Sequence, residues 1–203
     1  MISVLDTDLT YYRRNLPHRL PPGVNLFITF RLAGSLPRAV LDNLRTEWEQ
    51  LDKQHSMEDS YARQKRYFGR FDKLLDQASI GPTWLDEPTV AGVVAEALHY
   101  YDDCGYHLVC YCIMPNHVHL VATLPDASLP LLRTLQSIKS YSATKCNALL
   151  GRSGQFWQRE SYDHLIRDAG EMERIISYVL ENPVKARLTD DWQLWPHTYW
   201  HEL

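Results

Sequence analysis

Two short apolar runs, separated by three residues, constrain the fold of this chain more than any other feature. They are Tyr106–Ile113 and His117–Leu124, and the residues between them are Met114-Pro115-Asn116. Both runs are rich in β-branched and aromatic residues, and the intervening Pro-Asn pair is typical of a turn. The sequence therefore predicts two antiparallel strands joined as a hairpin.

Around this hairpin, hydrophobic periodicity predicts a mixture of strands and helices. A last helix is predicted to begin at Asp168, where Glu171 completes a capping box, and to reach Asn182, where Pro183 ends it. The order of elements predicts an α+β fold in which helices pack on a mostly antiparallel sheet. The remaining predicted elements are extended segments at 25–32 and 156–166 and helices at 39–54, 62–77, 89–101 and 129–150.

Length and charge together predict one domain that carries an elaboration. The 203 residues, 45% of them hydrophobic, suffice for a single domain at 1–203. Residues 42–103 hold thirteen acids and seven bases, and their pattern is largely helical. We expect this acidic stretch to form a helical elaboration between the first strand and the central hairpin.

Several classes of protein are disfavoured. No apolar run approaches the ~20 residues that cross a bilayer, and the first residues lack the basic and apolar regions of a signal peptide. The four cysteines are typical of reduced residues in an intracellular protein. We therefore expect a cytoplasmic protein that has no membrane partner.

The distribution of charge matters more than the net charge of −4. Residues 11–31 hold four arginines and no acid, and residues 127–167 hold six basic residues against two acids. Nucleic-acid affinity depends on a local basic surface, so these two stretches are a candidate footprint. Taken alone, the charges are equally compatible with ordinary solvated faces.

His117 and His119 are the first candidate functional residues. Side chains alternate along a strand, so two imidazoles at i and i+2 share one face, while Val118 and Leu120 point to the other. A pair of imidazoles on a rigid strand is half of a divalent-metal site. Alternating histidines also occur without metal, so the interpretation as a metal site depends on which other ligands accompany them.

Two completions of the site come from the hairpin itself. A zinc site would use Cys110 and Cys112. A three-residue loop would pair Ile113 with His117 and leave both thiols on the other face, whereas a two-residue loop would set Cys112 opposite His119. We favour the first register, which disfavours zinc. A histidine-triad nucleotide hydrolase would need a third histidine at Val121.

A third completion comes from the last predicted helix. Tyr178 and Asn182 are four residues apart and share a helix face. Packed on the histidine-bearing face of the sheet, this helix would offer a phenol and an amide oxygen. An amide oxygen is a hard ligand that suits Mg²⁺ or Mn²⁺, and imidazole tolerates Mn²⁺.

Five motifs resemble the REP-associated tyrosine transposases, which belong to the single-tyrosine HUH transposase superfamily. The similarity runs in order from about residue 11 to residue 195. Arg187 departs from the family pattern, because many relatives carry Gly there. The motifs are Tyr11-Tyr-Arg-Arg-Asn-Leu-Pro-His18, Phe27-Ile-Thr-Phe-Arg-Leu32, Met114-Pro-Asn-His-Val-His-Leu120, Ser153-Gly-Gln-Phe-Trp-Gln-Arg-Glu160 and Tyr178-Val-Leu-Glu-Asn-Pro-Val-Lys-Ala186.

The resemblance implies a ferredoxin-like fold and a metal-dependent endonuclease and strand transferase that acts on single-stranded or hairpin DNA in transposition and recombination. His117 and His119 would hold Mg²⁺ or Mn²⁺, with Asn182 joining the ligands. Tyr178 would be the nucleophile, leaving a 5′-phosphotyrosine and a free 3′-OH. Relatives act as monomers or homodimers, so a homodimer is one expected state. The alternative is a non-catalytic binder of structured single-stranded nucleic acid.

Other residues would contact DNA. Arg13 and Arg14 would form a basic arm, and Trp157, Phe156 and Tyr162 would stack on unpaired bases. Core packing is an equal alternative for Trp157 and Phe156. Tyr141 and Tyr162 are rival nucleophiles, but neither is followed by Asn-Pro. The residues expected to contact phosphates are Lys139, Arg159, Arg167 and Lys185.

Overall fold

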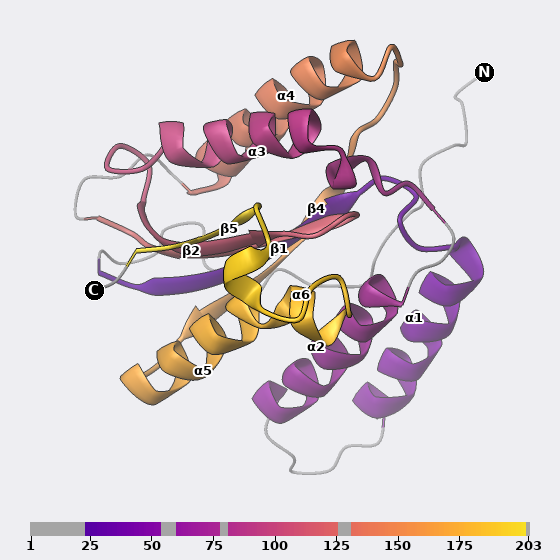
Figure 1. Cartoon of the computed structure of the whole chain (residues 1–203). Helices are drawn as coiled ribbons and strands as arrows, with labels where there is room; N and C mark the ends of the chain where they lie inside the picture. Colours follow the sequence, from indigo (N-terminus) through magenta and orange to yellow (C-terminus); the bar gives the residue numbers. More distant parts are fainter. Residues whose placement is uncertain (1–22, 54–59, 78–80, 126–130, 202–203) are drawn as a thin grey trace.

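Five antiparallel strands form one sheet in the order β4-β1-β3-β2-β5 (Figure 1). The computed structural model describes residues 23–53, 60–77, 81–125 and 131–201. The order β4-β1-β3-β2, with helices before β2 and before β4, is the ferredoxin-like arrangement, so the predicted fold class is confirmed. The strands are β1 (Asn25–Leu32), β2 (His107–Ile113), β3 (His117–Thr123), β4 (Trp157–Ile166) and β5 (Thr198–Trp200).

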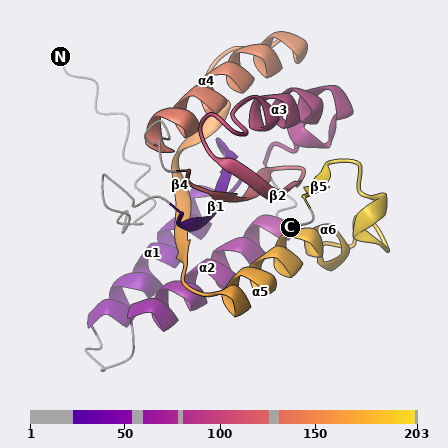
Figure 2. The same cartoon turned by 90° about the vertical axis from the view of Figure 1, so that its left-hand side faces the viewer.

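Helices cover both faces of the sheet (Figure 1). On one face lie α3 (Pro88–Tyr100) and α4 (Leu131–Leu149), and on the other α2 (Ser60–Asp76), α5 (Ala169–Leu180) and the short α6 (Asn182–Lys185). α1 (Arg38–Lys53) packs against α2, and Figure 2 shows α2 and α5 side by side. Short 3₁₀ turns occur at Trp84–Asp86 and Trp192–Leu194. In the described part of the chain, no helix is long and apolar enough to cross a membrane.

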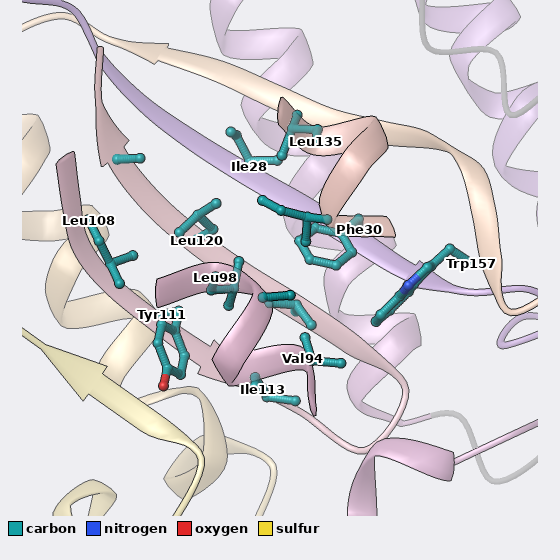
Figure 3. Close-up of a cluster of buried hydrophobic side chains, with 14 of the residues drawn as sticks. Ile28, Phe30, Val94, Leu98, Leu108, Tyr111, Ile113, Leu120, Leu135 and Trp157 are labelled. Atoms are coloured by element: carbon teal, nitrogen blue, oxygen red, sulfur yellow. The ribbon is translucent and has the colours of Figure 1, made fainter. Parts of the chain in front are cut away.

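Strict alternation along β1 decides which side chains meet which helices. Leu26, Ile28, Phe30 and Leu32 all face α3 and α4, where they join the larger buried cluster (Figure 3). Leucines and valines of α3, α4 and the hairpin strands complete this cluster, including Val94, Leu98, Leu120 and Leu135. This face is an ordinary apolar core, and it holds the sheet rigid.

The opposite face of the sheet is mixed in character. Phe27 and Val121 pack there against Phe68 of α2 and Val179 of α5. Polar residues of β1 and β3 lie on the same face, because Thr29 pairs with His119 across the two strands. Two helices cover this polar patch, so a functional site there would be shielded from water.

The register of the hairpin differs from the prediction. The chain turns over Pro115 and Asn116 alone, because the Met114 N–H donates to the His117 carbonyl (2.8 Å). Cys112 therefore pairs with His119, and the favoured pairing of Ile113 with His117 was wrong. Met114 belongs to the hydrogen-bonded ladder, so the loop is one residue shorter than its sequence suggests.

The end of the last helix also differs from the prediction. α5 ends at Leu180, and α6 begins at Asn182 with Pro183 in its first turn. Proline lacks an N–H, which the first turn of a helix does not need, so Pro183 starts a helix instead of stopping one. The Asp168 cap is as predicted, since its side chain accepts from the Glu171 N–H (2.8 Å).

The other predicted elements agree with the structure to within about three residues, except that β5 was missed. The predicted elaboration at 42–103 contains most of α1, all of α2 and α3. Of these, α3 packs on the larger core cluster, whereas α1 and α2 pack on each other and α2 also contacts the opposite face of the sheet. Arg13 and Arg14 lie outside the described residues.

Candidate functional site

The two imidazoles predicted from the sequence meet at the centre of the mixed face. His117 and His119 are both completely buried, and their Nε2 atoms lie 3.0 Å apart. Two ligands bound to one ion at right angles, at about 2.1 Å each, would be about 3.0 Å apart. The pair is therefore spaced as two ligands of one cation would be.

Neighbouring polar groups orient each imidazole. Asn116 Nδ2 donates to the Leu75 carbonyl of α2 (2.9 Å), which turns its Oδ1 toward His117 Nδ1 (2.6 Å). That oxygen can only accept, so the proton sits on Nδ1 and the Nε2 lone pair points into the site. The Thr29 hydroxyl forms a hydrogen bond with His119 Nδ1 (2.8 Å), which orients the second ring.

Two carboxylates complete the cluster, and the sequence analysis missed both. Asp72 and Asp76 come from α2, and Asp72 Oδ1 lies 3.3 Å from His119 Nε2 and 3.9 Å from His117 Nε2. Asp76 Oδ1 lies 3.9 Å from His117 Nε2. The available signal was an acid at position 72 on a helix face otherwise formed by Phe68, Phe71 and Leu75.

Asn182 reaches the same point from α6. Its Nδ2 donates to His119 Nε2 (3.1 Å), and the side chain is completely buried. A half-turn of the amide would present the oxygen instead. The structure thus brings together all three predicted metal ligands, and Asp72, His117 and His119 form a group whose ligand atoms lie within 4.8 Å of one another.

Three buried oxygens in this cluster find no hydrogen-bond donor among the described residues. They are Asp72 Oδ1, Asp76 Oδ1 and Asn182 Oδ1. A buried oxygen without a donor is costly, and a bound cation would offset that cost. A site of two imidazoles and three hard oxygens fits a divalent cation such as Mg²⁺ or Mn²⁺.

Burial sets the charge state of the ligands. Burial, together with His119, lowers the pKa of His117 to about 3, so this imidazole is neutral and can bind metal. Burial acts to raise the pKa of Asp72, but His119 and other neighbours outweigh it, and the pKa lies below its ordinary value. Burial and the charge of Asp72 raise the pKa of Asp76 to about 7.

Tyr178 lies beside the cluster, as the sequence predicted. Its half-buried ring packs 5.7 Å from the His119 ring, measured between centroids, and contacts Phe27 and Phe68. Lys185, seven residues further along, places its ammonium 4.7 Å from the centre of the Tyr178 ring. A phenol, a cation and a metal-binding cluster thus meet at one edge of the site.

The rival tyrosines and the cysteines are placed less favourably. Tyr141 is on α4, across the sheet, where its hydroxyl donates to Glu96 (3.2 Å). Tyr162 stacks on Phe68, 4.0 Å between centroids. Cys112 shares the histidine face, but its thiol contacts Met114 and Thr198 and is not among the grouped metal ligands of the described residues.

Several predicted DNA contacts have other roles here. Trp157 is 5% exposed, packs on Phe30 and donates to the Ser142 hydroxyl, and Phe156 is equally buried, so both are core residues. Lys139 donates to backbone carbonyls of β4 and is therefore already engaged. Arg159, Arg167 and Lys185 are exposed.

Comparison with known proteins shows which families this sequence resembles. Residues 86–182 match the family model "Transposase IS200 like". A Haemophilus influenzae protein assigned to the REP-associated tyrosine transposases is 30% identical over 105 residues, covering 47% of this chain and 60% of that protein. The REP-associated tyrosine transposase of Escherichia coli K12 is 23% identical over 99 residues, covering 49% and 57%. The chain thus matches less than two thirds of either relative.

A solved structure shares the fold over a longer stretch. It is the structure of a REP-associated tyrosine transposase bound to a REP hairpin, with a TM-score of 0.52 and 16% identity, covering 92% of this chain and 80% of that one. His117, His119, Tyr178 and Asn182 fall inside the family-matched segment, whereas Asp72 and Asp76 lie before it. The chain is thus similar to the REP-associated tyrosine transposases over about half of its length, and residues 86–182 match the IS200-like transposase model.

Proposed function

We propose that this protein cleaves and rejoins single-stranded or hairpin DNA by a metal-dependent reaction in which Tyr178 is the nucleophile. The observation that carries the proposal is the meeting of Tyr178 with a buried, oxygen-rich cluster that contains two imidazoles. A protein that only bound DNA would have no use for unpartnered carboxylates buried beside a tyrosine. The hairpin-bound relative supports hairpin DNA as the substrate.

The reaction exchanges one phosphate ester for another. Tyr178 Oη forms a bond to the scissile phosphorus, and the bond from that phosphorus to the 3′ oxygen breaks. The products are a 5′-phosphotyrosine and a strand that ends in 3′-OH. Because the ester is conserved, a second 3′-OH can reverse the step and join strands without another source of energy.

His117, His119, Asp72 and Asn182 would hold the cation, with Asp76 at its border. A bound divalent ion would polarise the oxygens of the scissile phosphate and orient it for in-line attack. The carboxylate and amide oxygens suit Mn²⁺ or Mg²⁺, and imidazole tolerates Mn²⁺. Asn116 and Thr29 orient the two imidazoles through Nδ1, and the Asn116 oxygen also fixes the proton of His117 on that atom.

Lys185 supplies a positive charge at the nucleophile. A phenol has an ordinary pKa of about 10 and is a weak nucleophile when neutral. An ammonium over the ring favours the phenolate and also attracts the phosphate that must approach it. We assign this positioning role to Lys185, which the sequence also predicted to contact a phosphate. Arg159 and Arg167 remain candidates for contacts with the flanking backbone.

The direct test is a covalent adduct. Purified protein is incubated with end-labelled hairpin DNAs that carry single-stranded flanks, with Mn²⁺ or with EDTA, and separated on a denaturing gel. We expect a shifted band with metal only, and its loss in Tyr178→Phe. Tyr141→Phe is the matched control, because that hydroxyl lies across the sheet from the metal cluster.

Two outcomes would contradict the proposal. An adduct that survives in Tyr178→Phe would remove this residue as the nucleophile. Tight binding of hairpins with no adduct under any metal would favour the alternative of a non-catalytic binder. Metal content separates the ligand sets: His119→Ala and Asp72→Ala should lose bound Mn²⁺, while Cys112→Ser should keep it.

A further inference from the structure

A cavity of about 260 Å³ opens beside Tyr178, between α2, β4 and α5. α2 and α5 lie side by side below the sheet, and β4 is its edge strand (Figures 1 and 2). The Tyr178 ring forms one wall, so whatever occupies the cavity touches the nucleophile. The metal cluster is close by, since the Tyr178 and His119 ring centroids lie 5.7 Å apart. The cavity thus borders the proposed active site, and the mechanism does not use it.

Aromatic side chains form most of its surface. Phe68 and Tyr162 stack on each other at 4.0 Å, and Phe27 meets Phe68 edge to face at 5.2 Å. Phe27 also contacts Tyr178. Flat aromatic walls are the means by which proteins hold unpaired bases, because every base offers a face for stacking.

The cavity also has a polar wall. Glu171 is only 5% exposed, yet its carboxylate lines the cavity. One of its oxygens lies 3.1 Å from His164 Nε2, and the other accepts from the Arg167 N–H (2.8 Å). These contacts hold the carboxylate still. Each carboxylate oxygen can accept more than one hydrogen bond, so Glu171 can also receive an amino group from a ligand.

Two cations stand at the rim. Lys65 of α2 and Arg174 of α5 line the cavity, and both side chains are exposed. They come from the two helices that border the cavity. An apolar slot with a buried acceptor and positive charge at its mouth is complementary to a nucleotide whose base enters while its phosphates stay outside.

We propose that this cavity binds one unpaired nucleobase of the DNA strand, next to the phosphate that Tyr178 attacks. This inference rests on the proposed function and adds a base-binding position to it. Sites that hold a drug-sized molecule have volumes of about 300–1,000 Å³. This cavity is smaller, so it suits a single base rather than a larger group. Stacking on Phe68 and Tyr162 would draw the strand across Tyr178.

Gly69 allows the cavity to be filled without removing any existing contact. It lies on α2 in the cavity wall, and a Cβ built there meets no described atom within 4 Å. Gly92 of α3 is a matched control, since it is also an exposed helical glycine with open space and lies across the sheet. Both Gly69→Leu and Gly92→Leu should leave the Tm unchanged or higher, because glycine is a poor helix former.

The experiment measures base binding without cleavage. Hairpin DNAs with 2-aminopurine at successive single-stranded positions are titrated with protein in EDTA, with fluorescence anisotropy reporting total binding. We expect one position to be quenched by the wild type and by Gly92→Leu, and not by Gly69→Leu. Replacing that base with an abasic site should weaken binding to the wild type by roughly 5- to 100-fold, and binding to Gly69→Leu by much less.

The outcomes separate this inference from the proposed function. Quenching that persists in Gly69→Leu, or the absence of quenching at every position, would overturn base binding here even if the adduct forms with Tyr178. A quenched position that Gly69→Leu abolishes would support it even if no adduct forms. An abasic site that is equally tolerated by all three proteins would also overturn it.

Discussion

In the metal-free protein, the stability of Asp76→Asn relative to the wild type should increase as the pH rises. Asp76 faces Asp72 and is mostly buried, which raises its pKa from 3.8 to about 7. The folded protein therefore holds this proton more tightly than the unfolded chain does. The resulting stabilisation is complete below about pH 4 and is lost as the pH rises through about 7, because the carboxylate must then ionise beside another carboxylate.

The size of the effect follows from the two pKa values. Between about pH 5 and about pH 8, linkage gives a loss of about 2–3 kcal/mol in the wild type that a neutral asparagine does not suffer. The side chain is 18% exposed, so solvent screening reduces this figure. We expect the advantage of Asp76→Asn in free energy of unfolding to grow by about 1–2 kcal/mol over this interval.

Urea denaturation in EDTA, followed by tryptophan fluorescence at several pH values, measures this difference directly. His117 titrates in both proteins, so its contribution cancels in the comparison. Added Mn²⁺ should reduce the advantage of the variant, because a bound cation favours the ionised Asp76 carboxylate that the variant lacks. If the difference in free energy of unfolding between the two proteins stays constant from about pH 5 to about pH 8 in EDTA, the pKa of Asp76 is not raised in the folded protein.

Three further predictions test other parts of the site. Asn116→Ala removes no ligand, but it should weaken Mn²⁺ binding by about 10- to 100-fold in calorimetric titration, because His117 loses its orienting acceptor; unchanged affinity would contradict this role. Lys185→Gln should slow adduct formation roughly 3- to 10-fold at low salt, with Lys185→Arg restoring most of the rate; a rate that does not respond to either change would rule out the positioning role. Trp157→Ala should cost about 3–5 kcal/mol in urea denaturation, while hairpin affinity of the folded variant stays unchanged; a stability loss under about 1 kcal/mol would show that Trp157 is not a core residue.

The strands of the hairpin could be predicted to within a residue, and the register could not. Alternation in β2 and β3 is strong, so the positions of both strands follow from composition and spacing. The register depends on whether Met114 belongs to the turn or to the ladder. A single hydrogen bond, from the Met114 N–H to the His117 carbonyl, distinguishes the two cases. A shift of one residue changes which side chains face each other, and here it moved Cys112 to the histidine face.

His117, His119, Tyr178 and Asn182 were found because local spacing and the family motifs mark them. Asp72 and Asp76 have no such mark, because an acid in a helix is usually a solvated residue. Only the packing of α2 under the sheet reveals that they face the imidazoles. Trp157 shows the opposite case: its residue type suits DNA, and its position on the sheet puts it in the core.

Lys139 bears on how two copies of this chain could associate. β4 is an edge strand, and an exposed strand edge invites pairing with another chain. The single ammonium of Lys139 donates to the carbonyls of three successive residues, 158–160, at the start of this edge. Those oxygens are then less available to a second strand. If the protein forms a homodimer, its sheet should not continue past this end of β4, and hydrogen exchange at 158–160 should not change with protein concentration.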